Sequence, residues 1–305
     1  MDPDFGTAGK VTISVSFGND IATALALQDD GKILVGGYSY LADISFVLAR
    51  LLSDGTLDPD FGTNGVVTTA IDGNTSIGKG LAVQADGKIL FAGGGIGGFA
   101  LVRYDSDGTL DTTFGTEGLS VVPFDGGGAQ ANAIALQSDG LIVLAGYASS
   151  KFSDSIAVAR FDSDGLLDPA FGSEGTMEAA WPGGSTASAL AIAEDGEITV
   201  AGAASNQAVI ARFTPAGALD PVFYGTGIRQ LTMTNVTMSA AYAIAVQYDG
   251  RPLIAGFVSH ATNDFLLIRM DNDGNYDPTF GTDGVVSTDF ANNLDIGHAM
   301  AVQPN

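Results

Sequence analysis

Short runs of apolar residues, separated by turns rich in Gly, Asp and Asn, recur along the whole chain. The clearest set comprises residues 65–69, 80–84, 88–93 and 99–104. In the second run of each set small and large residues alternate with a period of two, which is typical of β-strands. The Asp86-Gly87 pair between the second and third runs favours a tight hairpin turn. The pattern therefore predicts four short antiparallel strands per unit, opened by the run at 65–69, and essentially no helix.

A phrase of the form Leu-Asp-Pro-x-Phe-Gly-Thr-x-Gly joins one unit to the next and is clearest at residues 57–65. Its Phe recurs at Phe5, Phe61, Phe114, Phe171, Phe223 and Phe280, so successive copies lie 52–57 residues apart. Self-similarity at such a period indicates a repeat architecture, and four antiparallel strands per repeat are typical of a β-propeller. We predict one all-β propeller domain over residues 1–305. Its repeats begin near residues 2, 58, 111, 168, 220 and 277, and each Phe is expected to be buried between neighbouring blades.

The number of blades follows less directly, because the phrase and the second strand occur six times but the third and fourth strands only five times. We predict a six-bladed propeller whose last blade is incomplete; a five-bladed ring with two surplus strands is the alternative. The surplus strands are Lys10–Ser16 and Gly297–Gln303. Since exposed strand edges pair readily with other chains, the missing strands are expected from a longer chain or from a neighbouring copy, which could build filaments. A monomer with a two-stranded last blade is the alternative.

Composition narrows the classes of partner. Of the 305 residues 46% are hydrophobic and 42 are Gly, which allows a large core with many turns. The formal net charge of −23 repels nucleic acid and anionic lipid and attracts divalent cations. The chain has no Cys, which excludes disulfides and Cys-based zinc sites. We predict a protein or glycan surface as the partner, with copies of the chain itself as a further one, and neither nucleic acid nor membrane insertion.

The run Ala-Val-Gln-x-Asp-Gly-Lys-Ile-Leu-x-Ala-Gly, then Phe-x-Leu-x-Arg-Tyr, then Asp-Gly-x-Leu-Asp-x-x-Phe-Gly, is best preserved at residues 79–118. It resembles the delta-60 repeat family, bacterial propeller-like repeats of unknown function. The resemblance implies the fold and an exported setting, and it supplies no catalytic residues. The fifth phrase departs from the pattern at Phe223-Tyr224-Gly225, where one residue is expected to be inserted before the Gly.

Acidic turns are the strongest chemical pattern. Three turns of the form Asp-x-Asp-Gly are each followed by a further Asp, which brings together oxygen ligands of the kind that calcium prefers. The candidate calcium ligands are Asp105, Asp107, Asp111, Asp162, Asp164, Asp168, Asp271, Asp273 and Asp277. Turn chemistry offers a simpler interpretation, because Asp and Gly suit a type I turn without any ligand.

An Arg closes the fourth strand of every repeat, at Arg50, Arg103, Arg160, Arg212 and Arg269. Its guanidinium is expected to bind backbone carbonyls or the Asp of the next phrase, as Arg103 with Asp111. The chain has two His, His260 and His298, and neither has Ser and Asp partners at a recognisable spacing; both are expected at the surface.

These observations favour a secreted or cell-surface structural and binding module, used for adhesion or as an assembly scaffold that could form filaments. Because no catalytic constellation is visible, we expect that the protein is not an enzyme. The alternative is a carbohydrate-active enzyme, a lyase or a glycosidase, with its site at one face of the propeller channel.

Overall fold

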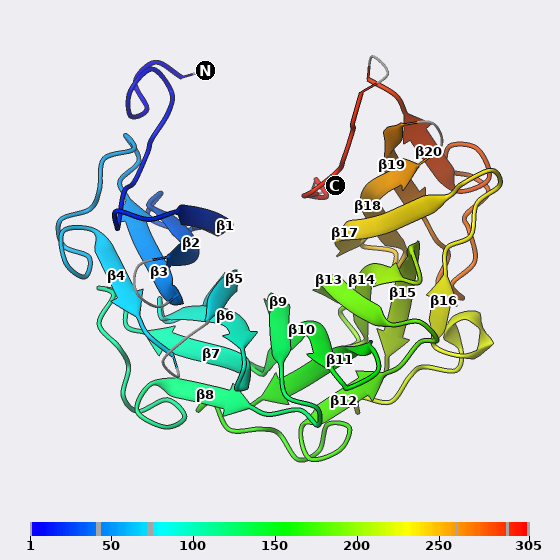
Figure 1. Cartoon of the computed structure of the whole chain (residues 1–305), viewed down its shortest axis with the longest axis horizontal. Coiled ribbons are helices and arrows are strands. Elements are labelled where there is room, and N and C mark those ends of the chain that lie inside the picture. The colour runs from blue at the N-terminus through cyan, green and yellow to red at the C-terminus, as the bar shows by residue number, and fades with distance from the viewer. Residues whose placement is uncertain (1, 41–43, 72–75, 260–261, 291–292, 304–305) are drawn as a thin grey trace. The chain divides into compact units, whose positions relative to one another are not determined.

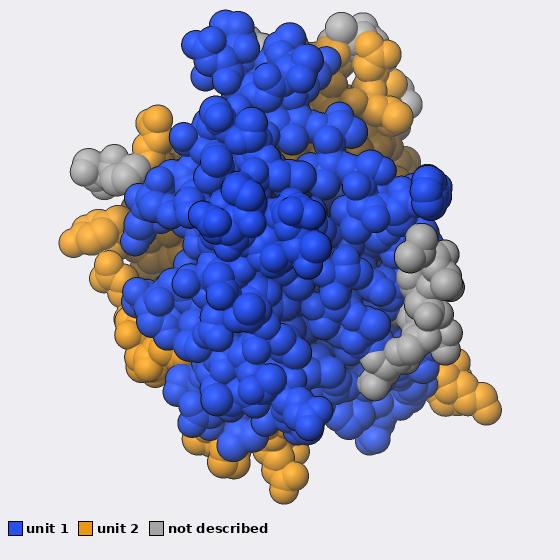
Figure 2. Space-filling model, turned by 90° about the vertical axis from the view of Figure 1, so that its left-hand side faces the viewer, with its two compact units in different colours: residues 1–136, 162–166 blue, residues 137–161, 167–305 orange. Residues whose placement is uncertain are grey.

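The computed structural model describes residues 2–40, 44–71, 76–259, 262–290 and 293–303. The described residues form β-strands joined by turns, with one short 3-10 helix, η1 (Phe223–Gly225), and no helix long and apolar enough to cross a membrane. The chain divides into two compact units, coloured separately in Figure 2. Unit 1 consists of residues 1–136 and 162–166, and unit 2 of residues 137–161 and 167–305.

Unit 1 contains two sets of four antiparallel strands, each paired in sequence order (Figure 1); the first set is a separate sheet, and the second is part of a larger sheet. The first sheet is β1 (Asp20–Leu27), β2 (Ile33–Tyr40), β3 (Ile44–Leu51) and β4 (Val66–Thr69). The second is β5 (Ile77–Val83), β6 (Ile89–Gly95), β7 (Gly98–Tyr104) and β8 (Leu119–Val122). A further strand of unit 1, β9 (Ala129–Leu136), pairs with β6 through Gly94 and Gly95.

Unit 2 repeats the same order of strands. Its first group is β10 (Ile142–Ser149), β11 (Asp154–Phe161) and β12 (Thr176–Ala179). The two complete sheets are β13 (Ser185–Ile192), β14 (Ile198–Ala204), β15 (Gln207–Phe213) and β16 (Ile228–Gln230), then β17 (Met238–Val246), β18 (Pro252–Ser259), β19 (Asn263–Arg269) and β20 (Val285–Thr288). The strands of the two units account for about five blades, and the predicted pattern of short antiparallel strands is confirmed.

The short strand after each phrase belongs to the sheet before it, which corrects the prediction that this strand opens a new blade. β4 pairs with β3, with Val66 opposite Ala49, although the phrase at 57–65 lies between them. The phrase is a compact reversal: Arg50 N donates to Gly65 O at 3.0 Å and Asp58 N donates to Arg50 O at 2.9 Å. Each sheet therefore combines three strands of one repeat with the first strand of the next, so the phrase fastens consecutive repeats together.

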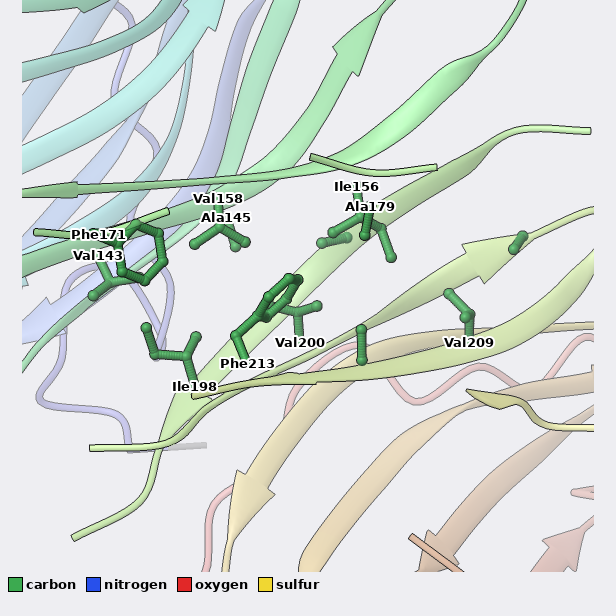
Figure 3. Packing of buried hydrophobic residues seen from close by; sticks show 13 residues of the cluster. Val143, Ala145, Ile156, Val158, Phe171, Ala179, Ile198, Val200, Val209 and Phe213 are labelled. Carbon is green, nitrogen blue, oxygen red and sulfur yellow. The ribbon is translucent and has the colours of Figure 1, made fainter. Parts of the chain in front are cut away.

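Apolar residues on alternate strand positions bury both faces of a sheet. In unit 2, one core cluster joins Val143 and Val158 of the β10–β12 group to Ile198 and Val200 of the next sheet, as Figure 3 shows. Neighbouring positions on the same strands point the other way; Ala201 contributes to the cluster shared with β17–β20. Because a period of two sends successive side chains to opposite faces, each strand contributes to two cores.

The Phe of the phrase lies within these cores. Phe61, Phe114, Phe171 and Phe223 are fully buried. Phe61, Phe171 and Phe223 belong to clusters that join one sheet to the next, which confirms the prediction for the interior repeats. Phe5 and Phe280 are only partly buried.

The two predicted surplus strands are not formed. Within Lys10–Ser16 only Lys10 takes part in a β-bridge, and Gly297–Gln303 is irregular throughout. A strand persists when its main-chain groups have a paired neighbour. Apart from Gly297 N, which donates to Gly256 O at 3.0 Å, neither segment makes a main-chain hydrogen bond to a sheet among the described residues. The described residues therefore form no sixth sheet, and the predicted number of six blades is not confirmed.

The fifth phrase contains no insertion. Tyr224 stands where the other phrases have Gly, and it adopts the same left-handed conformation, with φ of 53° beside 51° at Gly62. Tyr224 N donates to Asp273 O at 2.7 Å, as Gly62 N donates to Asp107 O at 2.8 Å. The spacing from Phe223 to Gly227 equals that from Phe61 to Gly65, so the expected extra residue is a substitution.

Candidate functional site

The Arg that closes the fourth strand forms a joint between one repeat and the next. Arg103 Nε donates to Asp111 Oδ2 at 2.7 Å, and Arg103 Nη1 donates to Ser163 O at 2.6 Å. The guanidinium lies 4.4 Å from the centre of the Phe114 ring. The predicted pairing of Arg103 with Asp111 and with a backbone carbonyl is thus confirmed.

The same three contacts recur in the other interior repeats. In each, Arg binds the Asp of the following phrase, covers the ring of its Phe and donates to a carbonyl in the Gly-containing turn after the next fourth strand; this turn is acidic except at Pro215. The sets are Arg50 with Asp58, Phe61 and Ser106; Arg160 with Asp168, Phe171 and Pro215; and Arg212 with Asp220, Phe223 and Asn272. Arg269 binds Asp277 and covers Phe280, but it donates to Thr279 Oγ1 and to no turn carbonyl among the described residues. A repeated contact set of this kind is a structural joint.

The Gly of each acidic turn is required by this joint. Gly108 has φ of 87°, and a Cβ there would lie 2.9 Å from Cε2 and Cζ of the buried Phe61. Gly165 stands in the same relation to Phe114, at 2.6 Å from Cζ. Both the backbone conformation and the close approach of the ring exclude a side chain at this position.

The third Asp of each candidate calcium site belongs to the joint. Asp111, Asp168 and Asp277 are the carboxylates bound by Arg103, Arg160 and Arg269. Burial alone would raise the pKa of Asp111, but hydrogen bonds from Lys88 and Thr113 outweigh it and hold that pKa well below its usual range. Hydrogen bonds from Thr279 lower the pKa of Asp277. Each of these three carboxylates is already paired with a protein cation.

The remaining candidates are turn residues. Asp162 Oδ1 and Asp271 Oδ1 accept main-chain hydrogen bonds within their own turns, and Asp107 Oδ1 accepts from Thr109. Asp105 forms an ion pair with Lys88 at 2.5 Å. The side chains of Asp164 and Asp273 are exposed. Within the described part of the chain no group of three or more acidic or His side chains is placed to hold a metal, and calcium binding stays a prediction.

The first strand of each complete set of four, β1, β5, β13 and β17, contains a β-bulge that the sequence did not predict. The residue at the bulge differs in every sheet, whereas its neighbours are small. The four bulge residues are Thr23, Lys79, Ser188 and Tyr242. Bulges commonly re-aim a side chain and occur beside functional sites. The variable residue of the repeat thus occupies a backbone position suited to ligand contact.

A glycine in the adjacent strand makes room for each bulge. A Cβ at Gly37, Gly93, Gly202 or Gly256 would overlap a carbonyl oxygen of the paired strand that contains the bulge. The Gly that ends the third run of each repeat was the available sequence signal, because Gly inside a strand marks a bulge or a close backbone approach.

Unit 2 has a groove of about 620 Å³ at one end of its sheets, and Tyr242 is one of its lining residues. The Tyr242 ring stacks on Phe257 at 5.9 Å and on His298 at 5.2 Å between ring centres. His298 is exposed, as predicted, whereas His260 lies outside the described residues. Phe152 adds a side chain that is 90% exposed, and Asp154 and Asn206 add polar groups.

Unit 1 has an apolar cavity of about 460 Å³ over one face of its first sheet. Val35, Val47 and Ala49 line the sheet side, and Val11 and Ile13 line the other. Asp20 is the one charged residue among the described residues that line the cavity, and its carboxylate accepts hydrogen bonds from Val15 N and Ser16 N. It is suited to an apolar protein segment more than to a polar small molecule.

Four segments match the model of a domain of unknown function described as a β-propeller, at residues 28–61, 84–114, 137–171 and 193–223. No curated protein sequence matches the chain. Among solved structures, a protein from Lactobacillus plantarum is similar with a TM-score of 0.54 at 17% identity, over 84% of this chain and 69% of that one. The repeats and the propeller-like, all-β fold are therefore confirmed at this level.

Weaker likenesses include virginiamycin B lyase from Staphylococcus aureus, with a TM-score of 0.44 at 12% identity over 88% of this chain and 84% of that one. A gluconolactonase from Xanthomonas campestris has a TM-score of 0.41 at 15% identity, over 87% and 89%. Enzymes on this fold contradict the prediction that the protein is not an enzyme, and that prediction is withdrawn. Likeness at this level concerns the fold alone and assigns no activity.

Proposed function

We propose that this protein is an exported binding module that holds a neutral glycan chain in the groove of unit 2. The observation that carries the proposal is the aromatic cluster in which Tyr242 stacks on Phe257 and on His298, in a groove that the exposed Phe152 also lines. Ligand sites typically combine aromatic walls with a few placed polar groups. Here Asp154 and Asn206 are the polar groups.

A glycan suits the groove better than an anion. Among the described residues that line the groove, Asp154 is the only charged one, and the chain carries a formal net charge of −23. Both repel phosphate and sulfate groups, whereas sugar hydroxyls can donate hydrogen bonds to the Asp154 carboxylate. The apolar face of a sugar ring can lie on the exposed Phe152 ring, which offers a large contact area at low entropic cost, and Tyr242 lines the groove beside it.

The proposal also includes the location of the protein and the number of blades in the complete propeller. The resemblance of residues 79–118 to delta-60 repeats supports a secreted or cell-surface location and a role in adhesion or assembly. The six copies of the phrase support a six-bladed propeller whose remaining strands come from other chain. In this proposal the repeat supplies the scaffold and the bulge residues supply the specificity.

The test is a glycan-array screen followed by titration of the best ligand. Tyr242→Ala and Phe152→Ala are each expected to weaken binding by roughly tenfold, since an aromatic contact at a binding site contributes on the order of 1–2 kcal/mol. Tyr248→Ala is the matched control, because Tyr248 is 85% exposed and does not line the groove. Failure of every glycan to bind, or equal loss in all three variants, would refute the proposal. A reducing-sugar assay on the bound glycan separates binding from cleavage.

A further inference from the structure

The apolar cavity of unit 1 lies over one face of its first sheet. The equivalent face of the second set of strands is completely covered. In β6 and β7 the corresponding face presents Phe91, Val102 and Tyr104, which are at most 1% exposed. They pack against Leu34, Phe46 and Leu48 of the preceding sheet. The repeat therefore defines what fits such a face: the alternating apolar residues of a third and a fourth strand.

Among the described residues of unit 1, none covers the first sheet in this way. Its equivalent positions are Val35, Ala49 and Leu51, and they open onto the cavity of about 460 Å³. Neighbouring apolar side chains are exposed as well, Leu25 by 71% and Ile21 by 40%. Apolar surface of this kind on a soluble protein marks an interaction site.

The segment that closes the far side of the cavity resembles an outer strand without its partner. Thr7 N donates to Lys10 O at 2.8 Å, as Thr63 N donates to Val66 O at 2.9 Å, so Lys10–Ile13 corresponds to Val66–Thr69. Val66–Thr69 is paired with β3 as strand β4. Val11, Thr12 and Ile13 make no main-chain hydrogen bond to any other described residue.

The joint beside the cavity is half assembled. Gly6 N donates to Asp54 O at 2.7 Å, which reproduces the contact of Gly62 N with Asp107 O. The Phe61 ring carries the Arg50 guanidinium at 4.4 Å, whereas no cation lies over the Phe5 ring within the described ranges. The interior joints therefore show where an Arg from another segment would lie: over the Phe5 ring, as Arg50 lies over the Phe61 ring.

We propose that this cavity binds a β-hairpin of the chain's own repeat type, supplied in trans by a partner protein. The hairpin's fourth strand pairs with Lys10–Ile13, its apolar face fills the cavity over Val35 and Ala49, and its closing Arg covers Phe5. Addition of strands to an exposed edge is a general mode of recognition in which main-chain hydrogen bonds give affinity and side-chain pockets give specificity. The proposal is independent of the glycan groove.

The test uses a fluorescein-labelled peptide with the sequence of residues 88–104, the β6–β7 hairpin, titrated with the whole protein and followed by anisotropy. We expect saturable binding that Leu101→Asp in the peptide weakens at least roughly tenfold, because a carboxylate enters an apolar cavity. Arg103→Ala in the peptide is expected to weaken it less. Neither change touches the protein, so its folding is not in question.

Two protein variants locate the site. Val35→Asp is expected to lower the affinity at least as much as the peptide's Leu101→Asp. Leu166→Asp, at a residue 59% exposed in a turn of unit 1, is expected to leave it unchanged. No saturable binding, equal binding of the Leu101→Asp peptide, or equal binding by a Val35→Asp protein with wild-type circular dichroism would each overturn the proposal.

Discussion

The strongest stability prediction concerns the Gly that faces the phrase Phe in each joint. Gly108 has φ of 87°, and a Cβ there would lie 2.9 Å from two atoms of the Phe61 ring and 3.0 Å from Val67 Cγ2. Phe61 is fully buried and cannot move aside without disturbing the core it shares with Leu48 and Phe91. Gly108→Ala therefore combines backbone strain with overpacking.

The magnitude follows from the two terms. A left-handed conformation costs a non-Gly residue about 1–2 kcal/mol. Forcing an extra carbon into a packed core adds about 1–3 kcal/mol. The free energy of unfolding should fall by about 2–5 kcal/mol in Gly108→Ala, as the sum of these terms.

Gly31→Ala isolates the first term. Gly31 is also in an Asp-Gly turn of unit 1, with φ of 81°, but a Cβ there meets nothing within 4 Å. This variant should lose only about 1–2 kcal/mol. Urea unfolding followed by circular dichroism measures both. Equal losses in the two variants would show that the Phe61 contact does not restrict the turn and would refute the account of the joint.

Three further predictions concern charge and backbone strain. Glu174 is exposed with φ of 51°, so Glu174→Gly should stabilise the protein by up to about 1 kcal/mol in the same urea assay, whereas Glu194→Gly, which has no positive φ to relieve, should destabilise it. The pKa of Asp111 is lower in the folded protein than the ordinary 3.8, so its contribution to stability is complete above pH 3.8 and is lost as the pH falls below it. Asp111→Asn should flatten this acid limb of a melting-temperature profile, and an unchanged limb would contradict the assignment. Melts in EDTA and in millimolar calcium should have equal midpoints if the acidic turns are turn residues only, as the binding of Asp111 by Arg103 and Lys88 favours; a higher midpoint in calcium would support the predicted calcium sites.

The strands and the joint were largely predictable because both follow from local and periodic patterns. The period of two placed the strands, and one Arg per repeat beside one Asp per repeat was sufficient to pair Arg103 with Asp111. The pairing of residues 66–69 with the preceding sheet could not be predicted from closeness in the sequence, because the whole phrase lies between β3 and β4. That pairing depends on the tight reversal of the phrase, which no run of apolar residues reveals.

The groove was not predictable for a different physical reason. Tyr242 belongs to strand β17, Phe152 to the loop between β10 and β11, and His298 to an irregular segment beyond β20. Each is an isolated residue, far from the other two in the sequence. Only the tertiary arrangement of unit 2 brings the three side chains together. The bulge did leave a trace, the Gly that ends the third run, but its meaning depends on the carbonyl that faces it across the sheet.

The division between repeated and varied residues indicates where specificity lies. Arg, Asp, Phe and Gly of the joint recur because each contacts the others in the same geometry, so a change in any of them alters stability. The bulge residues Thr23, Lys79, Ser188 and Tyr242 have no shared partner that would fix their identity. Thr23 Oγ1 donates to Gly78 O at 2.7 Å, whereas Tyr242 stacks on two rings. The bulge position accepts a hydroxyl, an ammonium group or an aromatic ring with the same backbone geometry. Its side chain can therefore change to suit a ligand without a change in the fold.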